Sequence, residues 1–331
     1  MTIKHRHCYP LKFPGAGTTA GFAAWLLLAM PAGAQLSQFK NTVGSRVEAA
    51  TILGGDYGVS GGAYTSVNNN SGNVDISISK FGGMGDIGAP QQLGTLDIGW
   101  QPQVQGSMGY LTATKHYNGE SVLNGDQNED KTFAIQFGGG ARFWFNDNFS
   151  IAPTFMGMYG YTENSYTANS IFGQANQGAA RQLGLIDWNV DTATIRPALD
   201  VQYQYTWHRT IFTLSSDPTY YYTWGFDSSS ANVDVSGNSE SWENKLDVDI
   251  PTGVELWGHE LRTGGYFSRT ELWDGLQQGL NTDYYYEAHG RLVLDFLNQL
   301  WKVQWIGIGY SYMWSSNFSG WSVGADVTFR F

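Results

Sequence analysis

Cysteine is almost absent from this chain of 331 residues, in which Cys8 is the single example. One cysteine excludes a disulfide scaffold and any site built from several thiolates. Charge is scarce as well: 14% of the residues are charged, and 18 basic against 29 acidic side chains give a net charge of −11. Because phosphates are bound by basic patches, this acidic balance also argues against nucleic-acid binding.

The first 34 residues have the layout of a secretory signal peptide. Basic residues open the chain, Ala20–Met30 is an apolar run too short to span a bilayer, and Ala32-Gly33-Ala34 offers small residues for cleavage. We therefore predict export and removal of residues 1–34. Since Cys8 would leave with the signal, the mature chain would have neither a thiol nucleophile nor a lipid-bearing cysteine.

Beyond residue 34, no apolar run reaches the ~20 residues that a membrane helix needs. The composition is nevertheless unusual for a soluble domain, because aromatic residues make up 15% and glycines number 42. A transmembrane β-barrel reconciles the two observations, since its strands alternate lipid-facing with lumen-facing residues and their average hydropathy stays modest. A secreted β-sandwich, whose strands also alternate, is the competing fold.

The C-terminal strand favours the barrel. Its last eleven residues alternate apolar with polar side chains, and the chain ends on an aromatic residue. Such a strand suits a wall with lipid on one side and a polar lumen on the other. One face holds Trp321, Val323, Ala325, Val327, Phe329 and Phe331, and the other holds Ser322, Gly324, Asp326, Thr328 and Arg330.

The connections between the predicted strands are alternately tight and long. Asn146-Asp147-Asn148 and Trp207-His208-Arg209 are tight, whereas residues 162–189 and 225–243 are long and polar. Outer-membrane barrels show this alternation, with short turns on the periplasmic side and long loops outside. Aromatic residues also gather at both ends of the strands, where the two membrane interfaces would lie. A sandwich explains neither feature.

We predict an all-β fold, a transmembrane antiparallel barrel over residues 58–331 that follows an N-terminal helical extension over residues 35–57. Twelve strands put both termini on the periplasmic side. Fourteen and ten strands are the alternatives, because residues 83–99 are ambiguous. The predicted strands are 58–67, 74–82, 100–116, 131–145, 149–161, 190–206, 210–224, 244–257, 261–273, 284–297, 302–314 and 320–331.

The strand phase assigns charged side chains of both signs to the lumen, whereas Leu292, Leu294 and Ile250 are assigned to lipid. Nearly equal numbers of acids and bases favour ion pairs across the lumen, and twelve strands enclose less space than the 16–18 of porins. We therefore predict a constricted lumen. The predicted network is Arg142, Arg196, Asp200, Asp247, Asp249, Glu255, Arg262, Glu287, His289, Arg291, Asp295, Asp326 and Arg330.

Residues 36–50 differ from the rest of the chain, because their apolar side chains recur at helical spacing. We predict a short amphipathic helix that plugs the barrel. It would pack on lumen positions such as Gly138 and Trp144, while Arg46 and Glu48 join the charged network. A stub outside the barrel is the alternative. The apolar positions are Leu36, Phe39, Val43 and Val47.

Three short segments add to these features: Ile52-Leu53-Gly54-Gly55-Asp56, Trp100-Gln101-Pro102 and Gly320-Trp321-Ser322-Val323-Gly324. With them, the chain resembles the translocator barrel of bacterial autotransporters, and in particular the passenger-less group called solitary outer-membrane autotransporter barrels. The resemblance implies a multi-pass barrel in the outer membrane of a Gram-negative bacterium, in contact with lipid and lipopolysaccharide. It also implies that the barrel assembly machinery reads the terminal Phe331.

No pattern in the sequence predicts a catalytic, cofactor or metal site. Glu287, His289 and Arg291 share one strand face, but successive residues on such a face are ~7 Å apart, and no serine is obviously placed as a nucleophile. The acidic run Asp126–Asp130 lacks the glycine and the spacing of a calcium loop. We therefore expect lumen ion pairs, a solvated loop and no enzyme.

The expected function is that of an integral outer-membrane barrel with a structural or surface-interaction role and a constricted lumen. A pore for small solutes is the first alternative. An outer-membrane hydrolase is the second.

Overall fold

A computed structural model describes residues 43–53, 58–67, 73–94, 98–118, 122–230, 233, 235–296 and 303–329. The predicted signal peptide, Arg330 and Phe331 lie outside these residues. Residues 43–52 form the N-terminal helix. The remaining elements are β1 (Gly58–Ser66), β2 (Val74–Asp86), β3 (Gln91–Gln92), β4 (Gly99–His116), β5 (Gln127–Trp144), β6 (Phe149–Thr167), α3 (Ile171–Gln182), β7 (Asn189–Trp207), β8 (Thr210–Ser228), β9 (Ser236–Leu256), β10 (His259–Trp273), α4 (Asp274–Leu280), β11 (Tyr284–Asp295), β12 (Val303–Trp314) and β13 (Phe318–Phe329).

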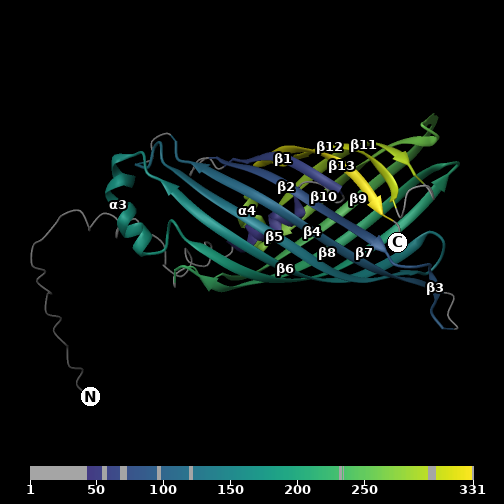
Figure 1. The fold of residues 1–331 in the computed structure, drawn as a ribbon, viewed down its shortest axis with the longest axis horizontal. Helices are drawn as coiled ribbons and strands as arrows, with labels where there is room; N and C mark the ends of the chain where they lie inside the picture. Colours follow the sequence, from purple (N-terminus) through teal and green to yellow (C-terminus); the bar gives the residue numbers. More distant parts are fainter. Residues whose placement is uncertain are drawn as a thin grey trace, which may run out of the picture. The chain divides into compact units, whose positions relative to one another are not determined.

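The strands form one antiparallel sheet that closes on itself (Figure 1). From β4 to β13 the neighbours follow the chain order, β13 pairs with β1, and pairing of β2 with β4 completes the ring. β3 is a two-residue extension beside the end of β4. The wall therefore has twelve strands, as predicted, and residues 83–86 of the ambiguous segment belong to β2.

The predicted strands recur in the structure, but several continue further toward the long loops. β5 begins at Gln127 rather than residue 131, and β9 begins at Ser236 rather than residue 244. Above the membrane both strand faces meet water, so hydrophobic alternation stops marking a strand there. The same segments contain α3 and α4, which the sequence pattern did not predict. We call this side of the barrel the loop end and the opposite side the turn end.

The alternation divides the wall into the two predicted faces. Phe133 and Phe137 of β5 are exposed on the outer surface, whereas Arg142 of the same strand is buried toward the lumen. On β11, Leu292 is exposed and the next residue, Val293, is buried. A strand shifted by one residue would reverse all of these positions. The predicted strand phase is therefore confirmed on both strands.

One irregularity leaves this phase unchanged. β9 holds two extra residues, Thr252 and Gly253, opposite the Leu261–Arg262 step of β10. Gly253 has a φ of 72°, a backbone conformation that glycine adopts readily. Because two residues are inserted, the alternation is the same on either side, and Val254 continues the lipid face.

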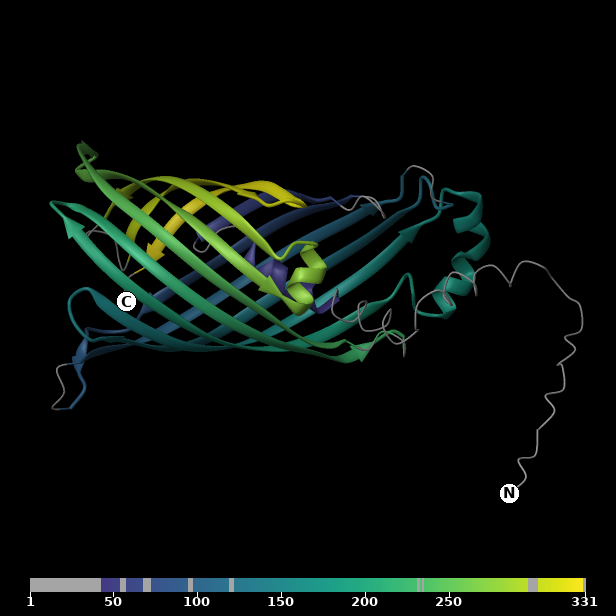
Figure 2. The same cartoon turned by 180° about the vertical axis from the view of Figure 1, so that it is seen from behind.

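The N-terminal helix lies inside the barrel, toward the loop end. Figure 2 shows it in purple beside α4 within the ring of strands, and Val47 shares a buried cluster with Leu276 of α4. Val43 packs against Trp188 and Val235 at the loop end. The helix thus runs from the loop end toward the turn end, where β1 begins; the residues before Val43 lie outside the described part of the chain, so the predicted side of the N-terminus stays a prediction. None of the helices among the described residues has the length and apolarity to cross a membrane.

Candidate functional site

Two glycines of the wall make room for the N-terminal helix. A Cβ added at Gly160 of β6 would lie 2.5 Å from Val47 Cγ1, and one at Gly109 of β4 would lie 2.0 Å from the carbonyl oxygen of Ala50. Side chains do not approach so closely, so glycine is what permits the helix to touch the wall. The glycines therefore form a fitted seat.

This seat differs from the predicted one. On β5, Ala134 belongs to the cluster around the helix, whereas a Cβ at Gly138 would meet Met156 of the neighbouring strand. Trp144 lies further still toward the turn end of β5. The helix sits nearer the loop end than the sequence predicted, because it continues to residue 52 before the chain returns to β1.

Polar side chains anchor the helix as well. Arg46 Nε lies 3.4 Å from a carboxylate oxygen of Asp130, and the Thr223 hydroxyl donates a hydrogen bond of 2.9 Å to Glu48. Glu48 is only 1% exposed. Burial raises the pKa of its carboxyl to about 7, although hydrogen bonds from Ser239 and Thr223 lower it. The helix is therefore held best when Glu48 is protonated.

More than this helix packs inside the loop end of the barrel. Leu276 and Leu280 of α4 are buried in the same cluster as the helix, and the Ser66 hydroxyl donates to the Leu280 carbonyl at 3.0 Å. An apolar layer covers the first turn of the helix, which begins at Val43. The residues that share this layer are Trp188, Val190, Val233 and Val235.

The acidic run Asp126–Asp130, most of which belongs to β5, is not the solvated loop that we expected. Asp126 is buried and accepts hydrogen bonds from the backbone N–H groups of Asn169 and Ser170, at 2.7 and 2.6 Å. The hydroxyls of Ser170 and Tyr166 also donate to it. Desolvation opposes its charge, but these hydrogen bonds together lower the pKa of Asp126 below its usual value. Its carboxylate holds the start of α3, which explains the burial.

The turn half of the lumen contains charged pairs from the predicted network. Each joins a buried or nearly buried arginine to an aspartate on another strand, and the guanidinium geometry suits a carboxylate partner. The pairs are Arg142 with Asp200 at 2.9 Å, Arg262 with Asp249 at 2.7 Å and Arg291 with Asp247 at 2.6 Å. These side chains reach across the strands on the lumen side of the wall.

Other residues of the predicted network are placed differently. Asp295 is 3.9 Å from Arg262, so it stands at the edge of that pair. The Arg196 guanidinium lies over the ring of Tyr221, 5.6 Å from its centroid. Glu255 is exposed near the turn end of β9, where it is the cross-strand partner of Glu260 on β10.

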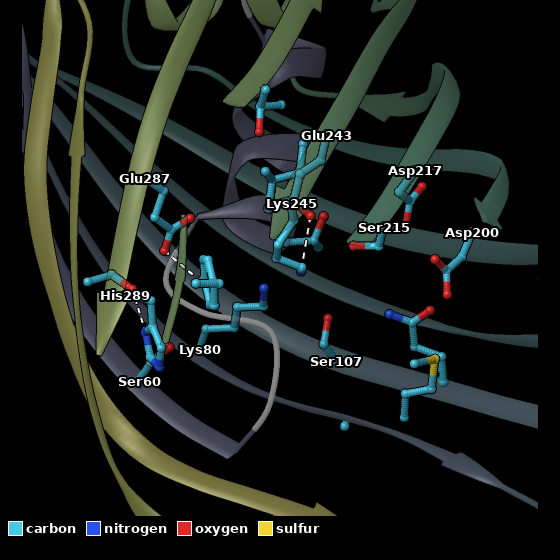
Figure 3. Close-up of a pocket in the computed structure, with 18 of the residues that line it drawn as sticks. Ser60, Lys80, Ser107, Asp200, Ser215, Asp217, Glu243, Lys245, Glu287 and His289 are labelled. Atoms are coloured by element: carbon cyan, nitrogen blue, oxygen red, sulfur yellow. Dashed lines mark hydrogen bonds and ion pairs between the residues drawn. The ribbon is translucent and has the colours of Figure 1, made fainter. Parts of the chain in front are cut away.

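Between the helix and the turn-end pairs lies a polar cavity of about 350 Å³ (Figure 3). Thr51 and Ile52 of the helix line it, together with Tyr266 and Trp305 of the wall. Acidic side chains outnumber basic ones around it. The charged and titratable residues that line it are Lys80, Arg196, Asp200, Asp217, Glu243, Lys245, Asp247, Glu287, His289, Arg291 and Asp326.

His289 has partners that the sequence did not reveal. Its Nδ1 is 2.9 Å from the Ser311 hydroxyl, and its ring stacks on Tyr266 with centroids 4.7 Å apart. The Tyr266 hydroxyl in turn donates to Glu287 at 2.8 Å. Alternation shows which face a residue occupies but not which residue of the next strand lies opposite, so Ser311 and Tyr266 carried no signal.

Comparisons with known proteins agree with the barrel. A family model described as a solitary outer membrane autotransporter beta-barrel domain matches residues 90–324. The transport unit of the autotransporter AIDA-I from Escherichia coli has a TM-score of 0.52 at 10% identity, over 88% of this chain and 99% of that one. The translocator domain of NalP from Neisseria meningitidis has a TM-score of 0.52 at 13% identity, over 95% and 100%. Both show similarity of fold alone. No curated protein matches the chain.

Proposed function

The chain belongs to the family of solitary outer membrane autotransporter β-barrels and crosses the Gram-negative outer membrane many times; from this premise we propose that it is a closed, non-conducting barrel with a structural or surface-interaction role. The observation that carries the proposal is the seat of the N-terminal helix, whose Val47 and Ala50 touch wall positions that only glycine allows. A helix that packs this closely against the wall plugs the loop half of the lumen.

The loop end supports the surface-interaction part of the proposal. Buried Asp126 and the ion pair of Arg181 with Asp187, at 2.5 Å, hold α3 at its start and its end. The first residue of that helix, Ile171, is 90% exposed. A rigid outward helix with an apolar tip suits a contact outside the cell better than a mobile loop would. On the same proposal, lipid and lipopolysaccharide surround the wall, and the assembly machinery engages the C-terminal strand.

Conductance in planar lipid bilayers tests the closure. The wild-type barrel should give no steady current, whereas Gly160→Leu should conduct, because the new side chain occupies the place of Val47. Gly157→Leu is the matched control, since Gly157 lies three residues earlier on the outward-facing side of β6 and has nothing within 4 Å of an added Cβ. A shift in gel mobility on heating shows that each variant has folded.

A steady current through the wild-type protein would contradict the closed barrel. It would favour the small-solute pore instead, and the polar cavity of about 350 Å³ is the feature that supports that second function. Equal currents from Gly160→Leu and Gly157→Leu would show that the helix is not the plug.

A further inference from the structure

The imidazole of His289 is held in one orientation by the strands around it. One ring face stacks on Tyr266, at an interplanar angle of 10°. The ring also extends over Gly309 of β12, where an added Cβ would lie 2.5 Å from His289 Cε1. Any other residue at position 309 would push the ring away. The glycine therefore lets a side chain from β11 reach across β12 toward β13.

The partners of the two ring nitrogens determine where the proton is. Nδ1 lies 2.9 Å from the Ser311 hydroxyl, and Nε2 lies 3.6 Å from a carboxylate oxygen of Asp326. A neutral imidazole has one N–H donor and one acceptor nitrogen. The negative charge of Asp326, which lies beyond hydrogen-bond distance, favours the proton on Nε2, and Nδ1 then accepts the hydrogen bond of Ser311. A serine hydroxyl that donates to an imidazole beside a carboxylate has the partners of an activated nucleophile.

All three residues line the polar cavity below the helix. Lys80 and Ser60 are partners on adjacent strands and line the same cavity, and Figure 3 shows them on the His289 side of it. The lysine brings positive charge to a place where an oxyanion would form. We propose that Ser311, His289 and Asp326 form a nucleophilic serine site that cleaves small carboxylic esters within the lumen, an activity separate from the proposed closure.

The reaction would proceed in two balanced steps. Ser311 Oγ attacks the ester carbonyl carbon while its proton moves to Nδ1 of His289, and Asp326 stabilises the resulting imidazolium. The bond to the alcohol oxygen then breaks, the alcohol leaves with the proton from Nδ1, and an acyl-serine remains. Water attacks this acyl group with His289 as the base, which releases the carboxylic acid and restores the hydroxyl of Ser311.

A fluorophosphonate probe tests the site, because it bonds covalently to an activated serine. The folded full-length barrel in detergent is treated with the probe and the modified peptide is identified by mass spectrometry. Label is expected on Ser311 and should be lost in Ser311→Ala and His289→Gln. Asp326→Asn should slow labelling at least tenfold. Hydrolysis of p-nitrophenyl butyrate should follow the same order when the variants are made in the Gly160→Leu background, in which the lumen is open.

Ser322 provides the matched control. It is buried in the wall and is the direct cross-strand partner of Ser311 on β13, so Ser322→Ala should label like the wild type. The helix closes the loop end and would keep the probe from reaching the lumen, so the labelling is repeated in Gly160→Leu. Label on Ser311 in either background supports the site. The proposal is overturned if Ser311 is unlabelled in both backgrounds or if its labelling survives His289→Gln. Neither result affects the conductance test of closure.

Discussion

The two halves of the lumen have the same strand alternation but are filled in different ways. In the loop half the wall presents hydroxyls that bond to each other, such as Thr132 with Thr162 at 3.0 Å and Thr194 with Thr223 at 2.7 Å. These short side chains leave space, and a helix occupies it. In the turn half, long charged side chains reach across the strands and pair among themselves.

The difference illustrates two physical ways in which side chains and helices occupy the inside of a twelve-strand barrel. A wall of small and hydroxylated residues satisfies its own hydrogen bonds and leaves an even surface on which a helix can pack. A wall of buried charges must keep its partners, because an unpaired charge in this environment is costly. The loop half therefore depends on a separate segment of chain, whereas the turn half depends on pairs within the wall.

The largest effect is expected from deleting residues 43–52. The deletion variant should give large, steady currents in planar bilayers while it keeps its heat-dependent gel mobility, because the wall strands pair without the helix. Replacing Arg291 with Met and Asp247 with Leu together should leave the barrel closed. If the deletion variant stays closed, the turn-half side chains block the lumen alone and the contrast between the halves fails.

A smaller but substantial effect is expected from Asp249→Leu in the turn half. It leaves the nearly buried guanidinium of Arg262 without its nearest carboxylate, at 2.7 Å in the native barrel. The free energy of unfolding in urea should fall by about 3 kcal/mol. Adding Arg262→Met should recover part of this loss, because the nearly buried guanidinium is then removed, although Asp295 loses its contact with it at 3.9 Å. If Asp249→Leu is as stable as the wild type, the ion pairs do not stabilise the turn half of the barrel.

Glu48 offers a pH test of the loop half. Its carboxyl titrates near its usual 4.5 when the helix is free but at about 7 when docked. Docking is therefore strongest below pH 4.5, weakens as the pH rises from 4.5 to 7, and changes no further above that range. The loss is about 3 kcal/mol. Open events should be rarer at pH 5 than at pH 7.5. In Glu48→Gln, whose side chain is always neutral, open events should be rare at both pH values. If this variant shows the same pH dependence as the wild type, Glu48 does not cause the effect.

The smallest effect is expected at the turn-end rim. Arg209 donates to Glu260 at 2.7 Å, but its side chain is 66% exposed. Arg209→Ala should change the free energy of unfolding by no more than about 1 kcal/mol, because water screens such a pair. Bilayer currents should be unchanged. A loss as large as that of Asp249→Leu would mean that burial does not distinguish the lumen pairs from the rim.

The sequence by itself determined the wall of this protein. Alternation has a period of two residues and is local, so residues such as Phe137 and Arg142 reveal their faces without any knowledge of the neighbouring strands. Tight turns between alternating segments then order the strands, and their even number follows. The N-terminal helix was also visible, because its apolar spacing differs from that of every strand; it was predicted over residues 36–50 and is described over residues 43–52.

Only the tertiary structure determined which side chains contact each other in the lumen. The contact of Val47 with Gly160 and the hydrogen bond between His289 and Ser311 join residues whose registers are set by strand pairing and by closure of the ring. Alternation places Gly160 of β6 on the lumen face and Gly157 on the lipid face, but it does not show which of the lumen glycines seats the helix. Periodicity describes one strand at a time, whereas a site depends on the offset between strands.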